Sequence, residues 1–376
     1  MHKGKIVLIT PLYRVDKRTR TIKLLESCSS LGIAVHLVCW DRHSEYPLSS
    51  VDDRVESVHV LMRGGGYGGR LMALRYPVWM VRLFFYLLRH RRKENIYCLG
   101  FENAFPTFIT KNILGNKYIF DDADRFSMII NLPEPAYSTL RFLEKKVSEG
   151  SVVNIIPGMA RYEFRNNKQK IIRNNPDKKA MARSADIQLK PKVADVVVYL
   201  NGWLGETRGL PTALAVASKL SASSDPIAQR IKFIAAGRLE GPCAQKFVGL
   251  KNVVYYGEVS NEVALAYYRK ADFIFTYYDP NIKINRYAES NKWGDAISYC
   301  VPVLVNEEVY TSDFLVDAKC CARFRYDDSD SLLNFLLEAV ETPKMIATLK
   351  KNMEIVVSQG KTFDVEIKES LEELLA

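Results

Sequence analysis

The segment YLNGWLGETRGLPTALAVASKL, residues Tyr199–Leu220, joins an apolar strand to an apolar helix through a loop that is rich in glycine. Gly202, Gly205 and Gly209 lie in this loop, and glycine lets a backbone approach a ligand closely because it carries no side chain. The amides at the start of the helix, together with Arg208, would suit a diphosphate. An ordinary strand-to-helix turn with a solvated arginine is the alternative for this segment taken alone.

Short apolar runs alternate with helical patterns on both sides of this segment. Continuous Val, Ile and Leu runs are typical of strands buried on both faces of a parallel sheet, and the alternation predicts right-handed crossovers. The predicted strands are KIVLI, AVHLVCW, VHVLM, NIYCLG, KYIFD, SVVNII, VVVYL, KFIAAG, NVVYYG, DFIFTYY and PVLVN. The predicted helices are Arg18–Leu31, Leu71–Arg92, Ala104–Leu114, Ala136–Glu149, Pro211–Leu220, Glu262–Lys270, Lys292–Tyr299 and Ser331–Ala339.

The alternation breaks once, at a polar and basic stretch with two prolines, Ile171–Lys192. A chain of 376 residues is long enough for two domains. We therefore predict two Rossmann-like domains, over 1–175 and 193–345, joined by a linker over 176–192. The helices of 346–376 are expected to pack back toward the N-terminal domain.

The overall composition is that of a globular and basic protein. Apolar residues make up 48% and charged residues 26% of the chain, and the net charge is +10. Such a charge favours an anionic partner. The seven cysteines form no C-x-x-C pair, and no histidines have metal-ligand spacing, so we expect buried reduced thiols and no metal site. The N-terminus does not have the pattern of a signal peptide, and no apolar run is long enough to span a bilayer.

A second informative segment is NRYAESNKWGDAISYCVPVLVN, residues Asn285–Asn306. Lys292 falls in the first turn of its predicted helix, and Asp295 follows on the same face. A lysine near a phosphate and a carboxylate near ribose hydroxyls would clamp a nucleotide. A surface ion pair is the alternative for these two residues alone.

Taken together, the two segments resemble the glycosyltransferase group 1 family of the bacterial surface-polysaccharide type. In that family a strand leads to G-R-L, a short loop and K-G, and here Gly202, Arg208 and Gly209 match the glycines and the basic residue. KWGDAISYCVPVLVN resembles the family's K-L-x-E-A-x-A-x-G-x-P-V-I signature, with Lys292 and Asp295 as its charged residues. The resemblance implies the α/β fold called GT-B, two Rossmann-like doubly wound parallel-sheet domains facing a cleft, with the nucleotide sugar held mainly by the second.

Three positions depart from the family pattern. Trp203 stands where a phosphate-binding arginine is usual, Tyr287 stands in place of the first of two glutamates, and Asp295 replaces the second. The donor-binding residues that the resemblance implies are Gly202, Trp203, Arg208, Glu289, Asn291, Lys292 and Asp295. The donor would be a UDP-sugar, acting as a substrate, and no cofactor or metal is expected because cations and helix ends would neutralise its diphosphate.

The N-terminal domain resembles the family through KYIFDDADRF, which is similar to the segment written Y-D-x-H. Asp124 takes the histidine position, so we predict that it is the general base that accepts the proton of the acceptor hydroxyl. A contact to the acceptor, a metal site shared with Asp121 and Asp122, and a structural capping role are the alternatives. Other acceptor-side candidates are Asp16 and Arg18, from an Asp-x-Arg loop after the first strand, and Glu102 and Asn103, after the strand NIYCLG.

The helical pattern Leu71–Arg92 is apolar, aromatic and rich in arginine. This composition is typical of a helix lying in an anionic membrane interface, and an ordinary buried crossover helix is the alternative. Gly64, Gly66 and Gly69, just before it, satisfy G-x-G-x-x-G, but the match lies in a glycine-dense run outside the first strand–helix unit, so no dinucleotide site is predicted.

We therefore expect a cytoplasmic enzyme, peripherally bound to the inner face of the membrane, that transfers a sugar to a hydroxyl of a lipid-linked (polyprenyl-linked) or oligosaccharide acceptor during surface polysaccharide synthesis. A catalytically silent nucleotide-sugar-binding or scaffold protein, and a GT-B epimerase, are the alternatives. Nucleic acid is not expected to be a partner, because the positive net charge is the only feature of the sequence that would favour it.

Overall fold

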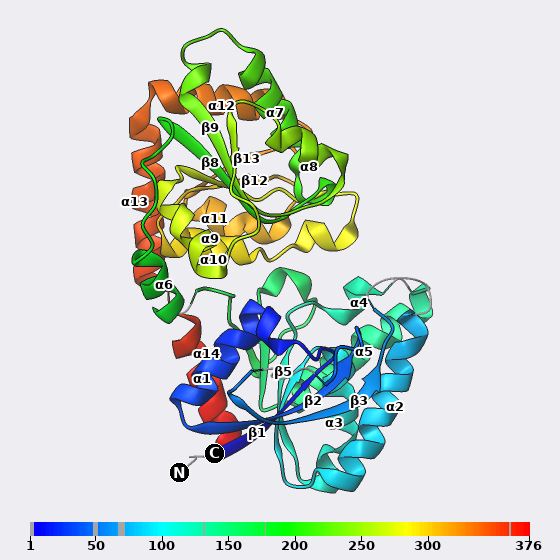
Figure 1. Ribbon diagram of the computed structural model, residues 1–376. Coiled ribbons are helices and arrows are strands. Elements are labelled where there is room, and N and C mark those ends of the chain that lie inside the picture. The colour runs from blue at the N-terminus through cyan, green and yellow to red at the C-terminus, as the bar shows by residue number, and fades with distance from the viewer. Residues whose placement is uncertain (1–3, 48–51, 67–71, 131, 177, 361) are drawn as a thin grey trace. The chain divides into compact units, whose positions relative to one another are not determined.

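The computed structural model describes residues 4–47, 52–66, 72–130, 132–176, 178–360 and 362–376. The chain forms two compact units (Figure 1). Unit 1 comprises Met1–Asn174 and Phe363–Ala376, and unit 2 comprises Asn175–Thr362.

Unit 1 is built on a sheet of parallel strands in the order β3-β2-β1-β4-β5-β6-β7. The order reverses at β1, whose two neighbours are β2 and β4, and in doubly wound sheets ligands bind beyond the carboxyl ends of the strands at such a point. The strands are β1 (Gly4–Thr10), β2 (Ile33–Asp41), β3 (Val55–Arg63), β4 (Asn95–Leu99), β5 (Lys117–Asp121), β6 (Val153–Ile156) and β7 (Gln169–Ile171).

Helices cover both faces of this sheet (Figure 1). One face packs against α1 and α14, which lie side by side, and the other packs against α2, α3 and α5. The helices are α1 (Thr19–Ser30), α2 (Met72–His90), α3 (Phe101–Leu114), α4 (Phe126–Ile129), α5 (Glu134–Gly150) and α14 (Phe363–Leu375). Leu71, the predicted first residue of the basic helix, and Gly69 lie outside the described residues.

Unit 2 repeats the arrangement with the strand order β10-β9-β8-β11-β12-β13, again parallel, and the order reverses at β8. Its strands are β8 (Val196–Leu204), β9 (Ile231–Leu239), β10 (Val253–Tyr255), β11 (Phe273–Phe275), β12 (Val303–Asn306) and β13 (Cys321–Phe324). Its helices are α6 (Lys178–Ala185), α7 (Leu210–Ala222), α8 (Gly241–Val248), α9 (Asn261–Tyr267), α10 (Asn291–Ser298), α11 (Asp313–Asp317), α12 (Ser329–Glu341) and α13 (Pro343–Gln359). The predicted fold class, two doubly wound parallel sheets, is thereby confirmed.

The segment 176–192, predicted to be a linker, is instead part of unit 2. It contains the helix α6, which packs against α9 and buries Ala180. The Arg269 guanidinium donates hydrogen bonds of 2.7, 2.9 and 3.0 Å to carbonyl oxygens in and just after α6. The sequence did not predict this helix because the segment is basic and only a few side chains of the helix face the core.

The two C-terminal helices also differ from the prediction, because they belong to different units. In α13, Ile346 and Met353 are buried in the cores of unit 2. In α14, Phe363, Ile367 and Leu371 are buried in the core of unit 1 beside α1. Only the last helix therefore joins the N-terminal sheet. In the described part of the chain, no helix is both long and apolar enough to cross a membrane.

Candidate functional site

Unit 2 brings two glycines together where the carboxyl ends of β8 and β9 pair. Gly202 and Gly237 are opposite each other in the register, and both have positive φ, +84° and +132°. A Cβ atom on Gly237 would lie 2.0 Å from the carbonyl oxygen of Gly202, so no larger residue fits there. The strand β8 thus continues through Gly202 and Trp203, which the sequence placed in a loop.

Arg208 ends the short 3-10 helix Glu206–Arg208 that follows β8. Its guanidinium carbon lies 5.2 Å from the centre of the Trp203 ring and 5.0 Å from that of Tyr278. No hydrogen bond or ion pair links this side chain to any other residue in the described ranges. Aromatic rings therefore hold the guanidinium and leave its N–H groups available to an anion.

Lys292, in the first turn of α10, reaches Gly202. Its Cε atom lies 4.0 Å from the position that a Cβ of Gly202 would take, so the structure brings the two predicted donor residues together. Like Arg208, Lys292 has no acidic partner among the residues that the structure describes. Glu289 precedes α10 and Asn291 begins it, so both lie within one helical turn of Lys292.

Asp295 lies one turn after Lys292 and is directed toward buried tyrosines. Its carboxylate is hydrogen-bonded to the hydroxyl of Tyr268, and its charge acts on Tyr199 as well. Burial, with the nearby Asp295 carboxylate, raises the pKa of Tyr268 well above its usual value, so the tyrosine stays a proton donor. The predicted pair of Lys292 and Asp295 is therefore not a surface ion pair, because the carboxylate has another partner.

In unit 1, a cavity of about 330 Å³ opens beside the loops that follow β1 and β2. Its lining is mostly charged and consists of Leu12, Tyr13, Arg14, Arg18, Asp41, Arg42, His43 and Glu45. The predicted Asp-x-Arg loop therefore contributes Arg18 to the cavity wall. Asp16 is not part of the wall and pairs with Arg14 instead, with its Oδ1 2.7 Å from the guanidinium Nε.

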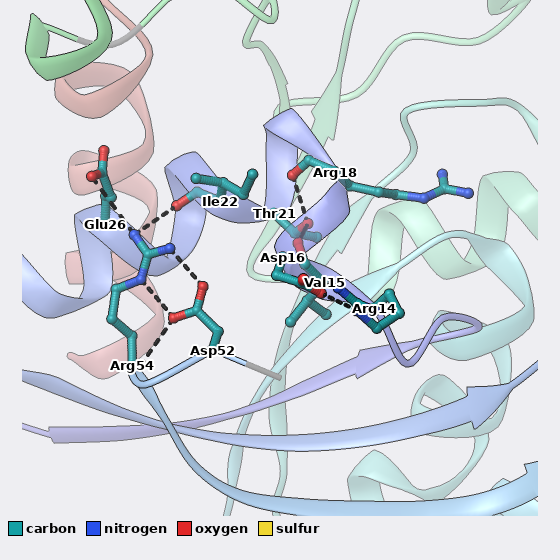
Figure 2. A network of polar contacts seen from close by, with 9 residues as sticks. All are labelled: Arg14, Val15, Asp16, Arg18, Thr21, Ile22, Glu26, Asp52 and Arg54. Carbon is teal, nitrogen blue, oxygen red and sulfur yellow. Dashed lines mark hydrogen bonds and ion pairs between the residues drawn. The ribbon is translucent and has the colours of Figure 1, made fainter. Parts of the chain in front are cut away.

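Figure 2 shows how this loop is held. The Thr21 hydroxyl donates to the carbonyl oxygens of Val15, at 2.6 Å, and Arg18, at 2.8 Å, and so fixes the start of α1. The Arg18 guanidinium points away from the other side chains drawn in Figure 2. Local hydrogen bonds thus fix the backbone while the arginine stays on the cavity side.

Glu102, in the first turn of α3, is a buried carboxyl group close to this cavity. Burial raises its pKa to about 7, the negative charge of Asp124 adds to the rise, and the positive charges of Arg42 and Arg18 oppose it. Because these charges act on one another, the side chains of Glu102, Asp124, Arg42 and Arg18 lie near the same edge of the sheet. A carboxyl group with a pKa near neutrality can accept or donate a proton at physiological pH.

Asn103, the neighbouring candidate, has a different environment. It is fully buried, its amide oxygen accepts a hydrogen bond of 2.8 Å from the Trp79 indole, and its amide nitrogen donates to the carbonyl of Leu99. Both polar atoms of the side chain are used within the fold. The structure therefore does not bring Asn103 together with Glu102 as a surface for a ligand.

Asp124 follows β5 and is 68% exposed, with Oδ1 3.4 Å from Nη1 of the buried Arg161. Its neighbours Asp121 and Asp122 are buried and engaged, the first with Arg20 at 2.8 Å and the second with the Tyr162 hydroxyl at 2.8 Å. Burial, reinforced by the charge of Glu144, raises the pKa of Asp122 to about 8. Asp124 is thus the one member of this acidic run that is exposed at the surface.

Three residues around these sites had no predicted role. Tyr278 supports Arg208, Arg42 lines the cavity of unit 1, and Arg238 lies opposite Trp203 in the sheet. Tyr278 ends the predicted strand DFIFTYY, Arg42 lies two residues after AVHLVCW, and Arg238 directly follows KFIAAG. This position at the carboxyl end of a strand was the available signal.

Neither a known sequence family nor a curated protein matches the chain. Many solved structures do. A sucrose-phosphate synthase from Thermosynechococcus elongatus superposes with a TM-score of 0.69 at 16% identity, over 99% of both chains. An E. coli trehalose-6-phosphate synthase with bound UDP-2-fluoro glucose gives 0.68 at 10% identity, over 98% of both chains.

A UDP-forming trehalose-phosphate synthase from Burkholderia xenovorans, in complex with glucose-6-phosphate, gives 0.69 at 9% identity over 99% of this chain and 100% of that chain. These identities are so low that the likeness establishes the architecture alone. The chain therefore has the GT-B fold of these glycosyltransferases, with two Rossmann-like α/β domains built on doubly wound parallel sheets.

Proposed function

We propose that this protein is a glycosyltransferase that takes a sugar from a UDP-sugar and joins it to a hydroxyl of a phosphate-bearing glycan acceptor. One observation carries the proposal: Lys292 lies beside Gly202, Arg208 lies over the ring of Trp203, the next residue of β8, and neither cation has an acidic partner among the described residues. Paired cations beside an exposed backbone suit a diphosphate better than a neutral ligand.

The donor half of the reaction would use unit 2. As the bond between the sugar and the diphosphate breaks, negative charge grows on the leaving phosphate, and Arg208, Lys292 and the amides that begin α7 would neutralise it. We assign no cofactor or metal to the reaction, because these groups would supply the same charge. The UDP-bound and UDP-forming relatives by fold support uridine as the nucleoside.

The acceptor half would use unit 1, with Asp124 as the general base. Its exposed carboxylate, at the carboxyl end of β5, could accept the proton of the acceptor hydroxyl as that oxygen attacks the sugar. Such a base contributes about 10²–10⁴ in rate. The arginine-lined cavity beside Arg18 and Arg42 would hold a phosphate of the acceptor.

A lipid-linked acceptor is supported by the outer face of α2. Exposed apolar side chains recur there every three or four residues, namely Leu74, Val78, Val81, Phe85 and Leu88. Exposed arginines accompany the stripe, namely Arg75, Arg82, Arg89 and Arg92. An apolar stripe flanked by arginines suits the surface of an anionic membrane, so we infer a peripheral protein of the inner membrane face.

A free sugar phosphate is the second candidate acceptor. Glucose-6-phosphate is bound in one relative by fold, and the basic cavity would suit its phosphate equally well. Both candidates present a hydroxyl close to a phosphate, and they differ in whether a lipid is attached.

An assay of UDP release from a panel of UDP-sugars tests this proposal. One arm receives polyprenyl-diphosphate-linked sugars in vesicles and the other receives glucose-6-phosphate, so the productive arm identifies the acceptor class. Asp124→Asn should abolish release while UDP binding persists, and Asp53→Asn, at an exposed aspartate of the same unit, should leave release unchanged. Binding without turnover in either arm would favour a silent nucleotide-sugar-binding protein.

A further inference from the structure

Arg238 is an exposed arginine at the carboxyl end of β9. The register of β8 and β9 sets Gly237 opposite Gly202 and Arg238 opposite Trp203. Residues paired in this way on neighbouring strands are roughly 5 Å apart. Arg238 therefore lies beside the residue whose ring supports Arg208.

The two strands carry the same pattern at their ends. Gly202, Trp203 and Leu204 close β8, and Gly237, Arg238 and Leu239 close β9 in exact register. The close approach of the two glycine backbones fixes this register, because a Cβ atom on Gly237 would meet the carbonyl oxygen of Gly202. An arginine on β9 is thus held next to the position where β8 presents a tryptophan.

The side chain of Arg238 is not used to stabilise the fold. No hydrogen bond, ion pair or ring contact joins it to another residue in the part of the chain that the structure describes. In contrast, Arg230, which directly precedes β9, forms an ion pair with Asp195 at 2.5 Å. Arg238 shares its lack of an acidic partner with Arg208, which lies over the Trp203 ring, and with Lys292, which lies beside Gly202.

Arg208, Lys292 and Arg238 are like charges near the carboxyl ends of β8 and β9, and an anion that reaches them lowers their mutual repulsion. A diphosphate has oxygens on two phosphorus atoms and can be held by more than one guanidinium at once. Gly202 and Trp203 are exposed at the end of β8, where a diphosphate could approach the backbone.

We propose that Arg238 is a donor-binding residue that contacts the diphosphate from β9. Strand β9 would thereby supply the positive charge that is missing from β8, where Trp203 stands in place of an arginine. Trp203 then serves as the ring that positions Arg208. This inference rests on the proposed function, since it takes a nucleoside diphosphate as the ligand of unit 2.

Calorimetric titration of the intact protein with UDP, GDP, ADP and dTDP tests the assignment. The diphosphate that binds wild type most tightly is then used with Arg238→Ala, and the parent nucleoside is titrated alongside. We expect the variant to bind the diphosphate at least about 10-fold more weakly and the nucleoside as before, because one charge-assisted hydrogen bond to phosphate is lost. Arg238→Lys should keep part of the affinity.

Two further variants separate this contact from a general effect of charge. Lys251→Ala removes an exposed lysine just before β10, at the amino ends of the strands, whereas Arg238 lies at their carboxyl ends, and this variant should bind as wild type. Trp203→Arg in the Arg238→Ala background should restore diphosphate affinity, because the two positions are neighbours in the register.

The outcomes distinguish this inference from the function on which it rests. If wild type binds none of the diphosphates, both are wrong. If wild type binds and Arg208→Ala weakens binding but Arg238→Ala does not, only the role of Arg238 is wrong. Equal losses for diphosphate and nucleoside, or a lower melting temperature of Arg238→Ala, would mean that Arg238 acts through the fold and would overturn the contact.

Discussion

The guanidinium of Arg208 stacks against the ring of Trp203, 5.2 Å from its centre. We therefore expect Trp203→Ala to weaken UDP binding several-fold, since an exposed cation–π contact is worth about 0.5–1 kcal/mol. Trp203→Phe should lose less because a ring is kept. Calorimetric titration measures both, and an unchanged affinity of Trp203→Ala would show that the ring does not position Arg208.

The contact between the backbones of β8 and β9 leads to a prediction about stability. Gly237→Ala should lower the free energy of unfolding by about 2–5 kcal/mol, because the new methyl group meets the Gly202 carbonyl and the positive φ is strained. Gly257→Ala is the matched control, since Gly257 also has a positive φ but nothing lies within 4 Å of its Cβ position. Its loss should be about 1 kcal/mol, from strain alone. Equal losses in urea unfolding would contradict the close packing at Gly237.

The buried Glu102 should make stability depend on pH. Its folded pKa of about 7 exceeds the usual 4.5, so its contribution is fully present below pH 4.5 and is lost as the pH rises through 7. Glu102→Gln removes this loss of stability. As the pH rises from 4.5 to 7, the free energy of unfolding of the variant should therefore increase by about 3 kcal/mol relative to that of wild type. Urea unfolding across this pH range measures the difference in free energy of unfolding between the two proteins. The titration of Asp122 cancels in this difference because both proteins contain Asp122. A difference that does not change with pH would show that Glu102 is ionised normally.

The exposed stripe of α2 predicts binding to anionic vesicles. Replacing Arg75, Arg82 and Arg89 by glutamine should weaken binding to phosphatidylglycerol vesicles roughly 100-fold, at about 1 kcal/mol for each arginine. Replacing three exposed lysines of unit 2, Lys251, Lys344 and Lys351, lowers the net charge equally and should have a much smaller effect. Flotation that is the same for both triple variants, or absent in wild type, would rule out a membrane role for α2.

Much of the architecture could be predicted from the sequence because buried parallel strands leave continuous apolar runs. The runs that contain Ile6 and Val198, for example, lie in central strands and are fully buried. The helix α6 was missed for the opposite reason: it is short and basic, and Ala180 is one of few residues that it buries.

The site was harder to predict, because it depends on contacts between distant segments. The resemblance predicts Arg208 and Lys292, whereas the fold places Lys292 beside Gly202 and Arg208 over the ring of Trp203. Arg238 was missed because it is adjacent to Trp203 only through strand register, which a single sequence does not contain. The burial of Asn103 against Trp79 could not be predicted either. Glu102 and Asn103 both follow the same predicted strand, so their positions in the sequence do not show which of them is hydrogen-bonded within the fold.

The central claim is that unit 2 binds a nucleoside diphosphate through Arg208 and Lys292, and titration of UDP into wild type and the double variant Arg208→Ala, Lys292→Ala tests it most directly. We predict saturable one-to-one binding to wild type and to the Lys251→Ala control, and a loss of at least about 100-fold in the double variant from two charge-assisted contacts. Wild type that does not bind UDP, or a double variant that binds it as tightly as wild type, would contradict the account.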